Sequence, residues 1–325
     1  TAGAALTKAG GTMTGIITNI SVDGTIKLDG NYPTGNNNVA LGNTALDNVE
    51  ATGNHNVAIG DAALTANTTG DNNVAVGRNS GAAITTGSYN VLSGALAGDA
   101  LTEGNSNVAI GDEALSADTL GSTSIAIGRR TLKLQNFTSA TSGYNVAVGH
   151  GAGAAILTAT NNTLIGGLAG DAITTGGSNI ALGVNALGGN STGTDNVAVG
   201  VAALKVATGS NNTAVGDGAG SLITSGAKNT ILGRYNGNQG GLDLRTTSSN
   251  IVLSDGDGNP RIVVNSSGNV GIGYTSPNEK LHVNGYIEAS SGFKLASHPV
   301  LDYTGFDGGY ATRLGSTGTS TLNAT

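Results

Sequence analysis

The sequence predicts an all-β parallel solenoid, or β-roll, of about twelve coils, and three observations carry this prediction. The phrase Asn-x-Val-Ala-Ile/Val-Gly recurs along most of the 325 residues, for example NVAIG at 56–60 and NVAVG at 196–200. Glycine supplies 55 residues, aromatic residues 3% and charged residues 11%, against usual values of about 7% glycine and about 25% charged residues. The near-constant period, with so few large side chains, favours thin stacked layers over one thick core.

The glycine that closes each phrase sets the period. Most intervals between these glycines are 17 residues, with single intervals of 18, 21 and 16. This period is too short for common two-helix repeats, and the Gly and Asn content opposes helix. Strands stacked about 4.8 Å apart would make a rod on the order of 55 Å long. The twelve glycines are Gly42, Gly60, Gly77, Gly94, Gly111, Gly128, Gly149, Gly166, Gly183, Gly200, Gly216 and Gly233.

Each coil is predicted to hold one short strand and one turn. In the second copy, Val57-Ala58-Ile59 is the strand, and Gly60 permits the positive φ of a sharp corner. Leu64 then belongs to a second short apolar segment, and a polar loop returns the chain to the next strand.

Both faces of the predicted strand are apolar. The outer positions are mostly Val, Ile or Leu, and the middle residue is Ala in nine copies and Leu or Ile in three. A strand that is apolar on both faces is buried on both. We therefore expect the outer residues to fill the coil and the middle residues to face neighbouring chains of a homotrimer; alternatively, Ala only tolerates a shallow surface. The predicted axis residues are Ala58, Ala75, Leu92, Ala109, Ala126, Leu164, Ala181, Ala198 and Ile231.

A slower period is superimposed on the first. Pairs of copies with Ala-Leu after the closing glycine, such as Ala63-Leu64, alternate with pairs that carry Ser-Gly or Ala-Gly, such as Ala97-Gly98. Leu92, Leu164 and Ile231 fall at the same place in each set of four. This pattern indicates duplication of a block of about 70 residues, with large and small side chains alternating in layers along the rod.

The repeat over residues 36–235 resembles the head repeat of trimeric autotransporter adhesins, in which three chains form a β-roll around one axis. The longer coil and the Ala-Gly copies depart from that pattern. Leu6-Thr7-Lys8-Ala9-Gly10-Gly11-Thr12-Met13-Thr14-Gly15 is similar to a short repeat of phage tail fibres. The segment from Ser267 through Gly273 to Gly285 resembles the part of phage fibres that precedes their intramolecular chaperone.

These resemblances imply a non-enzymatic segment of a phage tail fibre, a homotrimeric rod located in the virion. Its implied partners are two further copies of the chain, other tail or baseplate proteins, and a host cell-surface glycan or protein. A bacterial surface adhesin or extracellular filament subunit is the alternative, and a polysaccharide-degrading tailspike is a third. The missing chaperone fits either a released segment or a partial chain.

The chain divides into four predicted regions. Residues 1–35 are an N-terminal fibre connector, residues 36–249 the β-roll, residues 250–296 a hairpin and strand segment, and residues 297–325 a tail or cap. Residues 250–264 contain two strands around a turn that also resembles half of a calcium loop; its later positions do not match. The last region contains His298, Tyr303, Phe306 and Tyr310, for which packing between chains or a sticky tip are alternatives.

Composition argues against several classes of function. The net charge of −7 disfavours nucleic acid and anionic membranes as partners, and no apolar run reaches the length of a membrane span. No cofactor or metal is expected, because there is no Cys and the four His residues lack metal-ligand spacing. Gly149, Gly151 and Gly153 follow from the repeat and predict no phosphate loop.

The sixth coil is the irregular one, and its 21-residue interval predicts an exposed insertion. It contains Arg129, Arg130 and Phe137, which are the candidate receptor-binding residues. Exposed aromatic and arginine side chains often anchor ligands. The alternative is a tolerated bulge whose Phe137 packs back on the rod.

Overall fold

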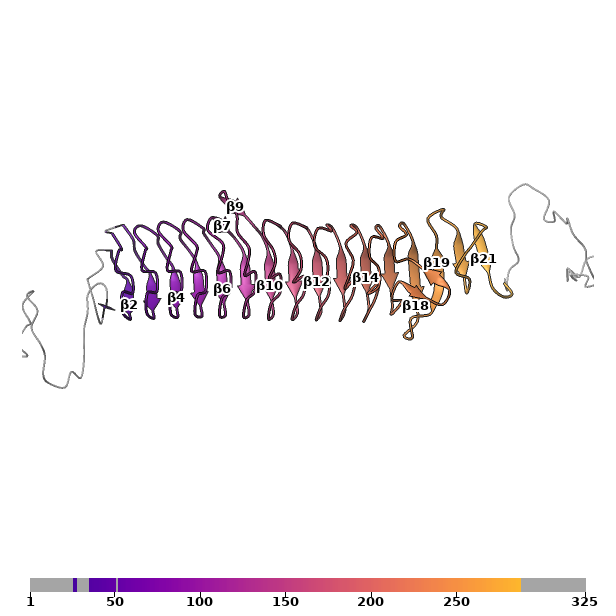
Figure 1. Ribbon diagram of the computed structural model, residues 1–325, viewed down its shortest axis with the longest axis horizontal. Coiled ribbons are helices and arrows are strands. Elements are labelled where there is room, and N and C mark those ends of the chain that lie inside the picture. Colours follow the sequence, from indigo (N-terminus) through magenta and orange to yellow (C-terminus); the bar gives the residue numbers. More distant parts are fainter. Residues whose placement is uncertain (1–25, 28–34, 51, 288–325) are drawn as a thin grey trace, which may run out of the picture. The chain divides into compact units, whose positions relative to one another are not determined.

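The structure is a computed structural model that describes residues 26–27, 35–50 and 52–287. The described chain is all-β, with a stack of short parallel strands that runs through the molecule as a solenoid (Figure 1). No described helix is long and apolar enough to cross a membrane. The stacked strands are β2 (Val39–Leu41), β3 (Val57–Ile59), β4 (Val74–Val76), β5 (Val91–Ser93), β6 (Val108–Ile110), β8 (Ile125–Ile127), β10 (Val146–Val148), β11 (Thr163–Ile165), β12 (Ile180–Leu182), β13 (Val197–Val199), β14 (Thr213–Val215), β15 (Thr230–Leu232) and β18 (Ile251–Ser254).

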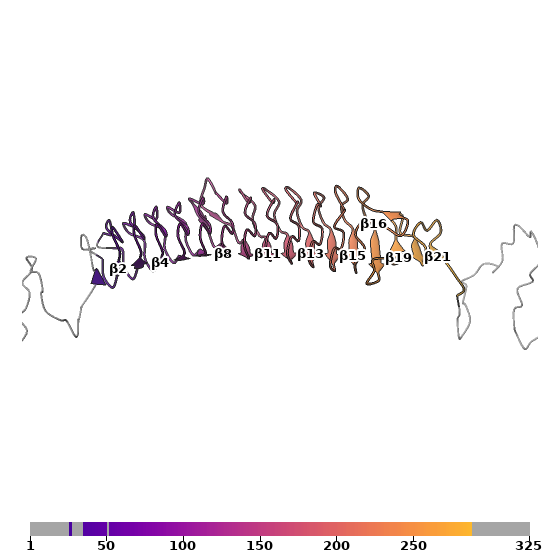
Figure 2. The ribbon, with the colours of Figure 1, turned by 60° about the horizontal axis from the view of Figure 1, so that its bottom comes forward.

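The strands pair in parallel and in register, which confirms the predicted fold. Ala58 of β3 lies opposite Ala40 of β2 and Ala75 of β4, and the same match continues to β18. β1 (Ile26–Lys27) pairs with β2 at the start of the stack. The strands gather on one side of the coils, and the connecting turns lie on the other (Figure 2). Like residues therefore stack on like residues in continuous rows.

The orientation predicted for the strands is wrong. The middle residues are 0–1% exposed within a single chain, so they point into their own coil and fill it. The outer residues are the half-buried or exposed ones, as the alternation along β3 shows for Val57 and Ile59. A coil closed by 17 residues has little room inside, so small Ala fits the interior and bulkier Val and Ile are left outside. The corrected residues are Ala58, Ala75, Leu92, Ala109, Ala126, Leu164, Ala181, Ala198 and Ile231.

The closing glycines form a row in which no side chain fits. Gly60 has φ of 132°, and a Cβ there would lie 2.5 Å from the carbonyl oxygen of Gly77 in the next coil. The other closing glycines lie equally close to the next coil. Glycine is therefore required for two reasons: its positive φ, and the lack of space for a side chain beside the neighbouring coil.

A buried ladder of asparagines precedes the strands. The Asn56 side-chain oxygen accepts hydrogen bonds from the backbone N–H of Asn73 (2.9 Å) and from its side-chain amide (3.2 Å). The Asn73 amide also donates to the Gly87 carbonyl oxygen at 2.8 Å. The ladder thus satisfies polar backbone groups that a three-residue strand leaves unpaired in the interior.

The predicted hairpin after the repeat is confirmed. β18 pairs antiparallel with β19 (Pro260–Val264), and β20 (Val270–Ile272) and β21 (Leu281–Val283) extend the sheet. In the turn, the Asp255 carboxylate accepts hydrogen bonds from the backbone N–H of Asp257 and Asn259 and pairs with Arg261. Asp255 therefore stabilises the turn as a hairpin residue. The segment 6–15 and residues 297–325, with His298, Tyr303, Phe306 and Tyr310, lie outside the described residues.

Candidate functional site: the irregular coil and the two faces of the solenoid

The extra residues of the sixth coil lengthen its loop, which forms a small two-stranded sheet with the loop of the preceding coil. β7 (Gly121–Ser122) pairs in parallel with β9 (Thr141–Ser142), and the loop rises above its neighbours (Figure 1). Phe137 is only 4% exposed. Its ring packs beneath the backbone of Gly121 and Gly143. The expectation that Phe137 contacts a receptor is therefore wrong, and the alternative of a ring packed back on the rod is what the structure shows.

The same insertion repairs a gap in the asparagine ladder. Ser124 occupies the ladder position of this coil, and the amide of Asn145 in the next coil donates to Gln135 and to the Ala159 carbonyl oxygen instead. The side chain of Gln135 takes over: its carbonyl oxygen accepts a hydrogen bond from the Asn145 amide at 2.9 Å, and its own amide donates to Ser124 Oγ at 3.1 Å. Sequence reasoning missed Gln135, although Ser124 in the asparagine column was a signal that something else must complete the ladder.

Asp118 is the buried carboxylate of this network. It accepts hydrogen bonds from the Gln135 amide at 2.6 Å and from the backbone N–H groups of Gly121 and Phe137. Burial nevertheless raises the pKa of Asp118 above its ordinary value, because desolvation outweighs these hydrogen bonds. The network fixes the loop from below, so this part of the coil is structural.

A cluster of charged side chains joins the fifth and sixth coils on the side of the solenoid opposite the stacked strands, which we call the turn side. Glu113 accepts hydrogen bonds from Arg130 Nε at 2.7 Å and from Lys133 Nζ at 2.9 Å, and these two partners lower its pKa to about 2. Arg129 pairs with Asp112 at 3.4 Å. Both arginine side chains are about half exposed. The structure thus leaves Arg129 and Arg130 at the surface, where contact with a ligand is possible.

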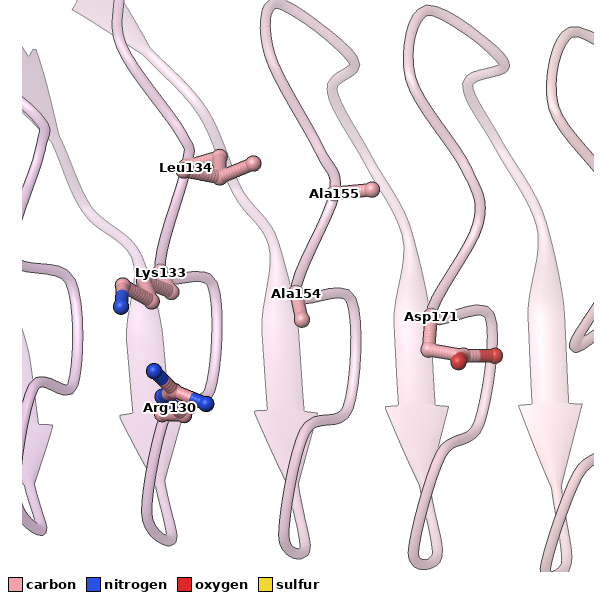
Figure 3. A pocket seen from close by; sticks show the side chains of 6 residues that line it. All are labelled: Arg130, Lys133, Leu134, Ala154, Ala155 and Asp171. Atoms are coloured by element: carbon pink, nitrogen blue, oxygen red, sulfur yellow. The ribbon is translucent and has the colours of Figure 1, made fainter.

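A hollow of about 310 Å³ adjoins this cluster. Ala154 and Ala155 form its floor, Arg130, Lys133 and Leu134 lie at one end, and Asp171 lies at the other (Figure 3). Burial raises the pKa of Asp171. The seventh coil has alanines where the sixth has lysine and leucine, and this step in side-chain size makes the hollow. We call it the charged hollow; its apolar floor and two oppositely charged ends suit a small ligand that carries both kinds of group.

The strand side of the solenoid has the opposite character. All outer positions of the thirteen stacked strands are Val, Ile or Leu except Ser93, Thr163, Thr213 and Thr230, and none is charged. Several are well exposed, including Leu182 at 45% and Leu232 at 52%. Because the coils are in register, these side chains form two mainly aliphatic rows, interrupted only by one serine and three threonines, which we call the strand face.

Comparison with known proteins gives no further identification. No family model matches the chain, and neither a curated protein nor a solved structure matches it. Within the described residues, no group of three or more His, Asp or Glu side chains is placed to hold a metal ion.

Proposed function

We propose that this chain is the structural and host-binding segment of a phage tail fibre, and that it works as a non-enzymatic homotrimeric rod in the virion. The strand face carries the proposal. Monomeric soluble proteins rarely expose a contiguous apolar patch larger than a few hundred Å², and here aliphatic rows run along thirteen stacked strands. A partner must cover them.

The partner that fits the strand face best is another copy of the same chain. The rows repeat with the pitch of the stacked strands, so a second solenoid presents the same spacing to them along the whole length. An apolar surface without charges also offers no charged group with which a smaller, polar partner could pair. The resemblance of the repeat to trimeric adhesin heads supports three copies around one axis.

This assembly would leave the turn side facing outward. The charged hollow and its Arg130 lie on that side (Figure 3), where three copies would face the host surface from one rod. Three weak sites on a rigid support gain avidity over one. The resemblance of residues 267–285 to the pre-chaperone segment of phage fibres supports attachment to other tail or baseplate proteins.

The test is the assembly state of paired variants. Native mass spectrometry of the purified chain should give about three times the 31.6 kDa of one chain. Leu182→Asp places a charge on the strand face, and we expect it to release monomers that keep their β-sheet circular dichroism. The matched control is Val206→Asp, which changes an exposed valine on the turn side and should leave the trimer intact.

A monomeric wild-type chain, or equal behaviour of the two variants, would overturn the proposed assembly. A trimer that shortens a bacterial capsular polysaccharide on incubation would instead favour the tailspike alternative.

A further inference from the structure

A second hollow lies where the solenoid gives way to the hairpins. Its volume is about 320 Å³, and it is lined by Asp217, Gly218, Ser221, Arg234, Asn236, Gln239 and Asp257. We call it the junction hollow. One wall comes from the turn side of the last regular coils, and the other comes from the β18–β19 turn and from β16 (Asn238–Gln239), which pairs with β17 (Leu242–Asp243). It is therefore separate from the charged hollow of the sixth coil.

Three side chains hold the walls of the junction hollow together. Arg234 pairs with Asp217 at 3.0 Å and donates a long hydrogen bond of 3.4 Å to the Gly256 carbonyl oxygen. The Gln239 amide donates to the Asp257 carbonyl oxygen at 2.7 Å. These contacts tie the hairpin turn to the coil, so the hollow is formed before any ligand arrives.

Other polar groups of the lining remain available. Among the described residues, no protein hydrogen bond occupies the Asp257 carboxylate, the Ser221 hydroxyl or the amide nitrogen of Asn236. The carboxylate is an anionic acceptor, the hydroxyl can both donate and accept, and the amide nitrogen is a neutral donor. The lining contains no aromatic or large aliphatic side chain, which makes the junction hollow polar throughout.

Charge narrows the class of ligand. Asp217 already neutralises Arg234, and Asp257 adds a negative charge, so a phosphate or sulfate would be repelled. A metal ion is disfavoured by the lack of ligands: within the described residues, no group of three or more His, Asp or Glu side chains is placed to hold one. The mixture of carboxylate, hydroxyl and amide groups instead suits a neutral molecule with several adjacent hydroxyl groups, because each hydroxyl can donate to a carboxylate while it accepts from an amide or guanidinium.

We propose that the junction hollow binds one neutral sugar unit of a saccharide. Two adjacent hydroxyls of the sugar donate to the Asp257 carboxylate and the Ser221 hydroxyl, and they accept from the Asn236 amide. The volume lies at the lower end of the range for small-ligand sites and suits a single sugar ring. The proposal goes beyond the fibre assignment, since it stands on these residues alone and holds for a monomer or a trimer.

The experiment uses saturation-transfer NMR on the full chain with the methyl glycosides of glucose, galactose, mannose and N-acetylglucosamine as probes. We expect at least one glycoside to receive saturation from the protein. Ser221→Ala removes one hydroxyl and Asp257→Asn removes one charge, and each should weaken that binding about tenfold, as expected for loss of a hydrogen bond to a charged or buried group.

Two matched variants control for unrelated effects. Ser225→Ala lies four residues beyond Ser221 and outside the lining, and Asp195→Asn removes an exposed carboxylate elsewhere on the solenoid. Both should bind like the wild type, and all four variants should keep the wild-type mass and circular dichroism. The absence of binding by all four glycosides, or binding unchanged in both Ser221→Ala and Asp257→Asn, would overturn the proposal.

Discussion

The solenoid contains two kinds of coil that fill the same interior in opposite ways. In one kind, the fourth residue after the closing glycine is a buried leucine, and the seventh is a smaller or polar residue. In the other kind, the fourth residue is glycine and the seventh is a buried Ile or Leu, except in the last coil, which is closed by Gly233. The first kind pairs Leu64 with Asn67 and Leu115 with Asp118, whereas the second pairs Gly81 with Ile84 and Gly98 with Leu101.

The difference shows that coils of the same backbone shape can place the large buried side chain at either of two positions, the fourth or the seventh residue after the closing glycine. The buried leucines have φ near +50°, a left-handed conformation in which only glycine is relaxed. Burial of the leucine side chain offsets this strain. The glycine coils avoid the strain, but they leave a space, and Leu92, Leu164 or Ile231 of the adjoining strands occupies it. The predicted alternation of large and small layers is therefore confirmed.

The largest loss of stability in this comparison of the two kinds of coil should come from Leu92→Ala. Leu92 is fully buried between Gly81 and Gly98, and neither glycine can fill the cavity that the substitution leaves. We expect the free energy of unfolding to fall by about 2–5 kcal/mol, measured by urea titration. Ala75→Gly in the neighbouring strand should cost less. A change below 1 kcal/mol would contradict the packing described.

Gly98→Ala should have the next largest effect. Gly98 has φ of 57°, and a Cβ there would lie 2.8 Å from Leu92 Cδ2. We expect a loss of about 1–3 kcal/mol in urea titration. Gly167→Ala is the matched control, because nothing lies within 4 Å of its Cβ position and its φ is ordinary; it should be neutral or slightly stabilising.

The double variant sharpens this comparison. If Leu92 is what excludes a side chain at position 98, then Gly98→Ala should cost less in the Leu92→Ala background than in the wild type. Strict additivity of the two changes would show that backbone conformation alone requires Gly98.

Gln135→Ala should have an intermediate effect confined to a leucine coil. It leaves the amide of buried Asn145 without the Gln135 carbonyl oxygen and removes a donor to Asp118. We expect about 1–3 kcal/mol of destabilisation, with faster amide hydrogen exchange near the sixth coil. Ser124→Asn in the same chain should recover part of the loss, since asparagine occupies this position in the other coils. Failure of this rescue would contradict the assigned role.

The smallest predicted effect is a pH-dependent difference in stability between the wild type and Asp118→Asn. Because burial raises the pKa of Asp118 in the folded chain, its contribution to stability is greatest at low pH and is lost as the pH rises through the folded pKa. Relative to Asp118→Asn, the wild type should therefore gain stability as the pH falls from 7 towards 4, which thermal unfolding at several pH values would measure. A pH-independent difference would contradict it.

Part of the candidate sites could be read from the sequence. The irregular interval located the sixth coil, and Arg129 and Arg130 are exposed there as expected. The sequence could not decide between an exposed and a buried Phe137, because an aromatic residue in an insertion is compatible with either. The ring is buried because Gly121 and Gly143, which contact it, have no side chains. The junction hollow had no sequence signal, since its residues come from coils and hairpins up to 40 positions apart.

The sequence by itself determined the coil. The period of 17 and the rows of Gly, Asn and Ala specify strand, corner and register, because each row fits only one environment in the stack. The tertiary structure alone decided which face of the strand is inside. Both faces are apolar, so hydrophobicity cannot distinguish them; the narrow interior does, since it admits Ala58 and its equivalents and leaves Val57 and Ile59 outside.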